Sequence, residues 1–201
     1  MFVITADQRG STRTGDRVEG LLAQLRAWEN AWAADIALPL ERTVGDEVQT
    51  VLRTPDAAVD LALTLARERD WAVGIGVSGA DEPLGSSARA SSGTAFVLAR
   101  KAVERAKLKS EPVPMVVAGT HEGAAEAATA VMQLLVSTVR RRSAAGWEVA
   151  DLLIEGVTQR AVATRLGIST QAVSQRVASA MIDEERRVRP VAAVLISSAG
   201  R

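Results

Sequence analysis

Two aspartates lie where they could bind a divalent cation. Asp7 follows the short apolar run Phe2–Ala6, and Asp46 lies in a glycine-containing turn between two further apolar segments. A carboxylate at a strand end and another at an adjacent hairpin tip can converge on one ion, and Mg²⁺ prefers oxygen ligands together with phosphate and water. We therefore predict a metal site at Asp7 and Asp46. The alternative is that Asp7 only caps the following turn and that Asp46 only belongs to a solvated hairpin.

The turn after Asp7 could hold a phosphate group. Its backbone amides stand at a helix entrance, where they can donate hydrogen bonds to an anion. Arginine and lysine side chains on later segments could neutralise the same group. The predicted nucleotide-binding residues are Gln8, Arg9, Gly10, Ser11, Thr12 and Arg100, with Arg89, Lys101 and Lys107 as further phosphate partners.

A second kind of chemistry, the recognition of DNA bases, is indicated by residues 158–178. The later half of this segment carries polar side chains on one face of an expected helix. Short hydroxyl groups, and a glutamine that can form two hydrogen bonds with adenine, suit a helix lying in the major groove. The predicted DNA-binding residues are Ser169, Thr170, Gln171, Ser174, Gln175 and Arg176.

The residues around this face are those that a helix-turn-helix needs. Thr158 is suited to cap the first helix, Ala163 is small enough for a close helix crossing, and Gly167 tolerates the positive φ of the turn. A shared apolar core is expected from Val162, Leu166, Ile168, Val173 and Val177. The alternative is a plain helical hairpin in which Gly167 only ends a helix. Nearby, Arg140–Arg142 could contact phosphate or could only stabilise a helix end.

The N-terminal elements follow from apolar periodicity. Expected strands are 2–6, 37–42, 47–52, 71–77 and 112–118, and expected helices are 16–32, one that starts at Pro55, and 94–108. Small residues alternate through Trp71–Val77, which permits another backbone to approach this strand closely. The order predicts an α+β fold, with a ferredoxin-like or cyclase-like mixed sheet and helices on one face.

A long helix and a helical region are expected to follow the sheet. Residues 123–142 carry an apolar stripe that must be buried, either against the first domain or against a second chain; its members are Val131, Leu134, Leu135, Val136 and Val139. Helix is expected until Pro190, and Val191–Ile196 could form a last strand. The predicted domains are 1–120, a connecting or dimerisation helix 121–145, and a helix-turn-helix domain 146–201.

Composition narrows the function classes. The 201 residues include no cysteine, which excludes disulfide scaffolds, thiolate metal sites and cysteine nucleophiles. The net charge is zero, so a pervasive basic surface is absent. No apolar run reaches the ~20 residues that span a bilayer, and the N-terminus has no signal-peptide pattern, so we expect a cytoplasmic protein. The single histidine, His121, is expected to mark a helix start.

These motifs resemble known families. The strand order, the Ala6-Asp7-x-x-Gly10-x-Thr12 turn and the Gly45-Asp46 hairpin resemble the catalytic domain of class III nucleotidyl cyclases and of GGDEF cyclases, over roughly the first 115 residues. The same segment is similar to the SatD-like family. From Gly146 to roughly Val188 the chain resembles helix-turn-helix domains of the LuxR and sigma-region-four type.

The cyclase resemblance implies a function, but the sequence departs from the cyclase pattern at one point. Cyclases hold a metal-bound nucleoside triphosphate with two carboxylates and use an Asn and an Arg to stabilise the transition state, but residues 95–101 contain no Asn. We therefore expect a dimeric, ligand-responsive transcription regulator that binds double-stranded DNA, with Mg²⁺ and a purine nucleotide in a catalytically degenerate domain. One alternative is an active nucleotidyl cyclase or nucleotide hydrolase with a DNA-targeting module. Another is a non-catalytic protein that docks on RNA polymerase.

Overall fold

The computed structural model describes residues 1–79 and 83–201, and its N-terminal part is built on one sheet. The strands are β1 (Phe2–Gln8), β2 (Ile36–Arg42), β3 (Glu47–Leu52), β4 (Trp71–Val77) and β5 (Met115–Gly119). They lie in the order β2-β3-β1-β4-β5. β1 is antiparallel to both of its neighbours, whereas β4 and β5 are parallel. The predicted mixed sheet is confirmed. Across the sheet, the neighbouring strands β2, β3, β1 and β4 alternate in direction, as in a ferredoxin-like split βαβ unit.

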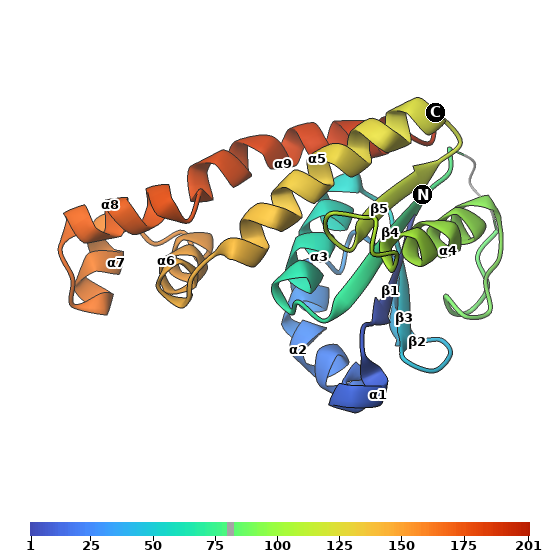
Figure 1. The fold of residues 1–201 in the computed structure, drawn as a ribbon, viewed down its shortest axis with the longest axis horizontal. Helices are drawn as coiled ribbons and strands as arrows, with labels where there is room; N and C mark the ends of the chain where they lie inside the picture. The colour runs from blue at the N-terminus through green and yellow to red at the C-terminus, as the bar shows by residue number, and fades with distance from the viewer. Residues whose placement is uncertain (80–82) are drawn as a thin grey trace.

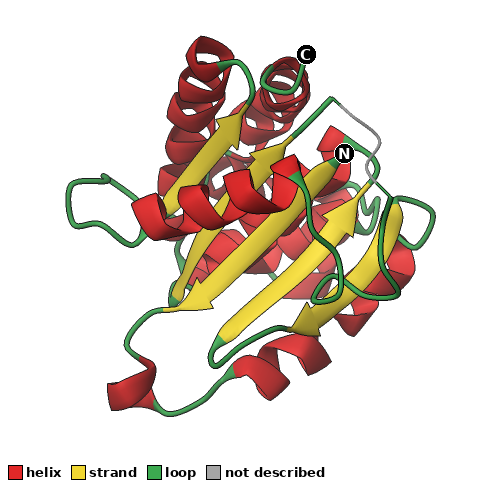
Figure 2. Ribbon diagram, turned by 90° about the vertical axis from the view of Figure 1, so that its right-hand side faces the viewer, coloured by secondary structure: helices red, strands yellow, loops and turns green. Residues whose placement is uncertain are grey.

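Helices cover both faces of this sheet (Figure 1). The larger hydrophobic cluster joins one face to α2 (Val18–Ala31), α3 (Pro55–Arg67), α5 (Glu122–Arg141) and α9 (Ile182–Ser198). The other face packs against α4 (Thr94–Ala106), which crosses in front of the strands in Figure 2. The expectation of helices on one face only was therefore wrong. Strand alternation explains the result, because Phe2 and Ile4 point to one layer and Val3 to the other.

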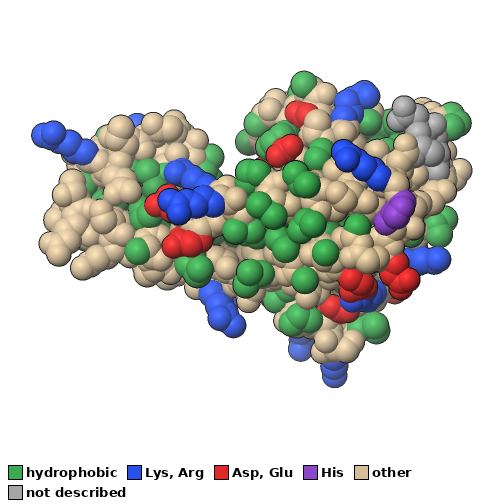
Figure 3. Space-filling view, turned by 90° about the horizontal axis from the view of Figure 1, so that it is seen from above, with side chains coloured by type: hydrophobic (Ala, Val, Ile, Leu, Met, Phe, Trp, Pro, Cys, Tyr) green, Lys and Arg blue, Asp and Glu red, His purple; other side chains and the backbone are tan. Residues whose placement is uncertain are grey.

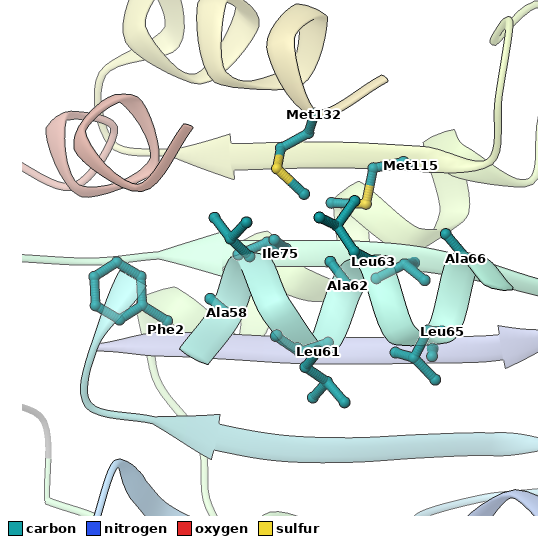
Figure 4. Packing of buried hydrophobic residues seen from close by; sticks show 14 of the residues in the cluster. Phe2, Ala58, Leu61, Ala62, Leu63, Leu65, Ala66, Ile75, Met115 and Met132 are labelled. Atoms are coloured by element: carbon teal, nitrogen blue, oxygen red, sulfur yellow. The ribbon is translucent and has the colours of Figure 1, made fainter. Parts of the chain in front are cut away.

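Helix α3 lies at the centre of the larger layer. It begins at Pro55, as predicted, and the Thr54 side chain caps it by accepting a hydrogen bond from the Ala57 amide. Figure 4 shows its buried side chains beside Ile75 of β4 and Met115 of β5. This packing fixes the sheet against the helical layer.

Two glycines bring α4 close to the sheet. A Cβ atom added to Gly74 would collide with the backbone of Val103, and one added to Gly76 would collide with the backbones of Ala95 and Ala99. The predicted close approach of another backbone to β4 is confirmed, and the partner is this helix.

The long helix α5 packs against the sheet with part of the predicted stripe. Leu135, Val136 and Val139 are buried and Val131 is half-buried, so the contact is with the first domain. Leu134 was expected in the same stripe, but it is 64% exposed. It lies on the opposite side of the helix from the sheet and has no apolar partner among the described clusters.

The expected last strand at 191–196 was wrong, since these residues belong to α9. The helix continues through Pro190, whose missing amide costs one hydrogen bond. Ala192, Ala193 and Ile196 are buried at helical spacing against α3 and α5. Tertiary packing therefore outweighs both the proline and the β-propensity of the valines.

The remaining helices form a separate small unit beyond the edge of the sheet (Figure 1). They are α6 (Ala144–Ile154), α7 (Gln159–Leu166) and α8 (Thr170–Ser179), whereas the short α1 (Ser11–Thr14) follows β1. Both α5 and the C-terminal half of α9 pack in the core of the sheet domain, and only α6–α8 with Ile182 form their own cluster. Among the helices that the structure describes, none is long and apolar enough to cross a membrane.

Candidate nucleic-acid interface

Helices α7 and α8 form a tight turn. Thr158 caps α7 by accepting from the Ala161 amide at 3.3 Å, and Ser169 caps α8 by accepting from the Ala172 amide at 3.1 Å. Gly167, between the helices, has φ 64° and ψ 32°, a left-handed conformation that disfavours side chains with a Cβ. The predicted caps and turn are thus present in the backbone.

A small apolar core holds the unit together. Val162, Ala163, Val173 and Val177 are buried, and Leu166 and Ile168 pack partly buried against them. α6 supplies the third wall through Val149 and Ala150, among others. The predicted core residues therefore lie together, with Ala163 at the crossing.

The outer face of α8 is open to solvent. Thr170, Gln171, Ser174 and Gln175 are all exposed. The Ser174 hydroxyl donates to Oε1 of Gln159 at 3.0 Å, which ties the face to α7. Hydrogen-bonding groups are thus displayed on a helix whose opposite side is fixed by packing.

Besides Ser174, two of the predicted DNA-binding residues have partners among the described residues. The Ser169 hydroxyl oxygen caps the helix. Arg176 is half-buried and its guanidinium lies 2.9 Å from Glu148 on α6. Ser169 thus stabilises the start of α8, and Arg176 holds α8 against α6.

Charge around the unit is balanced. Arg165 pairs with Glu155 at 3.2 Å, while Arg160, in the first turn of α7, is exposed. Of the three arginines at the end of α5, Arg141 is exposed. Phosphate contact was one of two alternatives for all three, and it does not apply to Arg142, because this side chain is buried.

Arg142 instead anchors the helical unit to the rest of the chain. Its guanidinium pairs with the buried carboxylate of Glu185 on α9 and donates to the Ala180 carbonyl at 3.1–3.2 Å. It also lies 4.5 Å from the ring centre of Trp147, with Arg67 at 4.0 Å from the same centre. Such cation–π contacts and a buried ion pair fix α6 against α9.

The ionic chain continues into the sheet domain. Arg189 pairs with both Glu185 and Asp60 of α3, and Asp60 accepts hydrogen bonds from the indoles of Trp28 and Trp32 at 2.8 and 3.1 Å. The charged groups of this junction line a cavity of about 280 Å³ together with apolar side chains; the lining residues are Asp60, Arg142, Glu185, Arg186 and Arg189 with Ala150, Leu153, Ile154 and Ile182. Sequence inspection missed this junction, and the only local signal was the i, i+4 spacing of Glu185 and Arg189.

At the predicted metal site, Asp7 is paired with a lysine. The ammonium of Lys107 lies 3.3 Å from Asp7 and 3.0 Å from Glu104. Burial raises the pKa of Asp7, against the opposing effect of Lys107, and the charges of Asp46 and Glu47 raise it further. The two predicted ligands are thus near each other, with a cation supplied by the protein.

Glu47, next in sequence to Asp46, is buried and is not a free ligand. It pairs with Arg100 and accepts from the Thr43 hydroxyl at 2.6 Å. Among residues 1–79 and 83–201, no group of three His, Cys, Asp or Glu side chains is arranged to hold a metal ion. A Mg²⁺ ion at Asp7 would have to displace Lys107, so the arrangement as it stands does not fit a two-carboxylate metal site.

The predicted phosphate turn divides into a structural and an exposed part. Gln8 is buried. Its side-chain Nε2 donates to the Gly15 carbonyl at 2.6 Å, and its Oε1 accepts from the backbone amide of Arg17 at 2.9 Å. Gly10 has φ 76°, and the following Ser11 and Thr12 are half-buried and exposed respectively. Gln8 therefore shapes the turn rather than facing a ligand.

Arg9 is exposed and lies near two further arginines. Arg140 donates to the Arg69 carbonyl at 3.0 Å. Burial lowers the pKa of Arg140, the charges of Arg9 and Arg69 lower it further, and the carboxylate of Asp70 opposes these effects. The predicted Arg9 thus lies in a charged cluster with residues that sequence inspection did not select, and Asp70 is an anion already present in it.

His121 stands at the N-cap of α5, as expected of a helix-start residue.

Comparison of the chain with family models, with curated proteins and with solved structures gives no match.

Proposed function

We propose that this chain is a DNA-binding transcription regulator that contacts base edges in the major groove with α8. The observation that carries the proposal is the exposed row of Thr170, Gln171, Ser174 and Gln175 on a capped and packed helix. These side chains donate and accept hydrogen bonds, and a glutamine can bond to N6 and N7 of adenine together. The turn geometry matches the helix-turn-helix arrangement in which the second helix enters the groove.

The balanced charge of the helical unit affects how strongly it should bind DNA of random sequence. Non-specific affinity for DNA comes mainly from phosphate neutralisation, and most cations here are already paired. Arg160 and Arg141 remain exposed on this side of the molecule. We expect weak binding to random DNA and a shallow salt dependence, so that discrimination comes from base contacts.

The experiment is selection of bound duplexes from a randomised library, followed by affinity measurements. Wild type should enrich one motif, and Gln171→Ala should weaken binding to it by about 5- to 150-fold, the effect of one bidentate base contact. Gln24→Ala, on the exposed side of α2, is the matched control and should bind as wild type does. The absence of any enriched motif at moderate salt would overturn the proposal.

Regulation by a nucleotide stays a prediction attached to this function. Mg²⁺ and a purine nucleotide were expected at Asp7 and Asp46, where Lys107 pairs with Asp7, so their binding would require Lys107 to leave this carboxylate. Titration of ATP and GTP with Mg²⁺ should then change DNA affinity in wild type but not in Asp7→Ala Asp46→Ala. Metal-dependent product formation from the triphosphate would favour the cyclase or hydrolase alternative. Binding to RNA polymerase without binding to DNA would favour the docking alternative.

A further inference from the structure

An apolar surface on the outside of α5 and α9 has no partner among residues 1–79 and 83–201, which the structure describes. Three large aliphatic side chains are among the exposed ones: Leu134 is 64% exposed on α5, and Val191 and Val194 are 53% and 65% exposed on α9. Ala127 and Ala130 are exposed at helical spacing with Leu134. Figure 3, which looks down on these two helices, shows hydrophobic side chains gathered over the middle of the pair.

The helices form one continuous surface because they pack along each other in opposite directions. Contacts between α5 and α9 are numerous, and the amide of His121 donates to the Ala199 carbonyl where α5 begins and α9 ends. Contiguous exposed apolar patches on soluble proteins mark interaction sites. We define this surface as the α5/α9 face, formed by Ala127, Ala130, Leu134, Val191 and Val194.

We propose that the α5/α9 face binds a second copy of this chain, with the two α5 helices antiparallel about a twofold axis at right angles to them. A 20-residue helix is about 30 Å long, and two packed helices with their side chains are about 20 Å wide. The footprint is therefore about 600 Å² for each copy, or about 1,200 Å² in total. That area reaches the lower end of the range for specific protein interfaces.

Side-chain size favours this antiparallel arrangement. An axis midway between Ala130 and Leu134 places the large Leu134 of each copy over the small Ala130 of the other. Such alternation of large and small residues lets two helix surfaces interdigitate. No charged side chain stands between these two positions on α5.

Charge at the ends of α5 also favours the antiparallel arrangement. Glu122 is exposed at the N-terminal end of α5 and Arg141 at its C-terminal end. The exposed charges of α9 next to the helical unit have both signs and favour neither arrangement; they are Asp183, Glu184, Arg186 and Arg187. In antiparallel copies Glu122 of one meets Arg141 of the other. In parallel copies like charges would meet at both ends, which is unfavourable.

The dimer separates the two helical units. Each unit follows the C-terminal end of α5, so antiparallel helices place the units at opposite ends of the assembly. Their separation exceeds the length of α5, about 30 Å, and half-sites at least one DNA turn apart are therefore expected. The interface itself does not depend on DNA binding.

The test is the mass of the full chain in solution by light scattering, together with its DNA affinity. Wild type should have twice the 21.2 kDa of the single chain. Leu134→Glu and Val194→Glu should give the single-chain mass with an unchanged circular dichroism spectrum. Val97→Glu is the matched control, because Val97 is a 55% exposed valine of α4, and it should remain dimeric.

A charge exchange tests the orientation. Arg141→Glu alone should weaken the dimer, and Glu122→Arg Arg141→Glu should restore it, since the opposite charges again meet between copies. A monomeric wild type, or a dimeric Leu134→Glu, would overturn the proposal. Gln171→Ala should lose DNA affinity while keeping the dimeric mass, so the failure of base recognition and the failure of dimerisation give different results.

Discussion

The sheet domain and the helical unit α6–α8 are stabilised in different ways. The sheet is buried on both faces, and large side chains such as Leu61 and Ile75 are fully enclosed. The helical unit buries only small and medium side chains, and its position relative to the sheet depends on the ion pairs of Arg142 and Glu185. The sheet domain is therefore held by apolar burial, while the orientation of the helical unit α6–α8 is set by polar contacts.

The largest effect should come from the junction. Arg142→Ala would leave Glu185 buried with one cation fewer and would remove the stack on Trp147, so we expect a loss of about 3–5 kcal/mol in unfolding free energy. Urea denaturation followed by tryptophan fluorescence measures it. Replacing both partners, as Arg142→Met Glu185→Leu, should recover most of the loss, because no uncompensated charge then remains. A loss below about 1 kcal/mol for Arg142→Ala would mean that the pair does not anchor the unit.

Apolar truncation should separate the two regions. Leu61→Ala in the sheet domain should cost about 2–5 kcal/mol through the lost burial and the cavity, and it should lower protection from hydrogen exchange throughout the domain. Val173→Ala removes two methyl groups from the smaller core and should cost about 1.5–2 kcal/mol. In Val173→Ala, the amide hydrogen-exchange rates should rise in α6–α8 alone. Equal changes in β1 and β4 would show instead that the two regions unfold as one.

A smaller effect is expected on acidification. The hydrogen bonds that Arg105 of α4 donates to Glu126 of α5 hold the pKa of this carboxyl below its ordinary value of 4.5. A lowered folded-state pKa contributes stability above the ordinary pKa, and this stability is lost as the pH falls through the folded-state value. Wild type should therefore lose more thermal stability than Glu126→Gln between about pH 5 and about pH 3. Parallel pH profiles would show that this pair contributes nothing, and the exposed position of Glu126 keeps the expected difference small.

Much of the fold could be predicted because local signals agree with packing. Trp71–Val77, Glu47–Leu52 and the start at Pro55 were recognised from alternation and from the proline position. The strand expected at 191–196 was wrong because valines favour strands. The burial of Ala192, Ala193 and Ile196 depends on contacts distant in sequence. Leu134 misled for a related reason, since periodicity gives an apolar stripe but not its width.

The candidate sites were predictable to different degrees. The helix-turn-helix is encoded locally by its caps, by Gly167 and by its apolar spacing, and the exposed face of α8 follows from these. The ion pairs of Asp7 with Lys107 and of Arg142 with Glu185 join residues far apart in the chain. Single-sequence inspection assigns charge to such residues but cannot assign their partners.

Base recognition by α8 is tested most directly by replacing one ring nitrogen of the DNA with carbon. In the selected motif, 7-deazaadenine replaces each adenine in turn and so deletes the N7 acceptor that a glutamine would contact. At one position we expect wild type to lose about 5- to 150-fold in affinity, while Gln171→Ala, which already lacks the contact, loses nothing further. An equal loss in both proteins at every position, or no loss in wild type at any adenine, would contradict base recognition by α8.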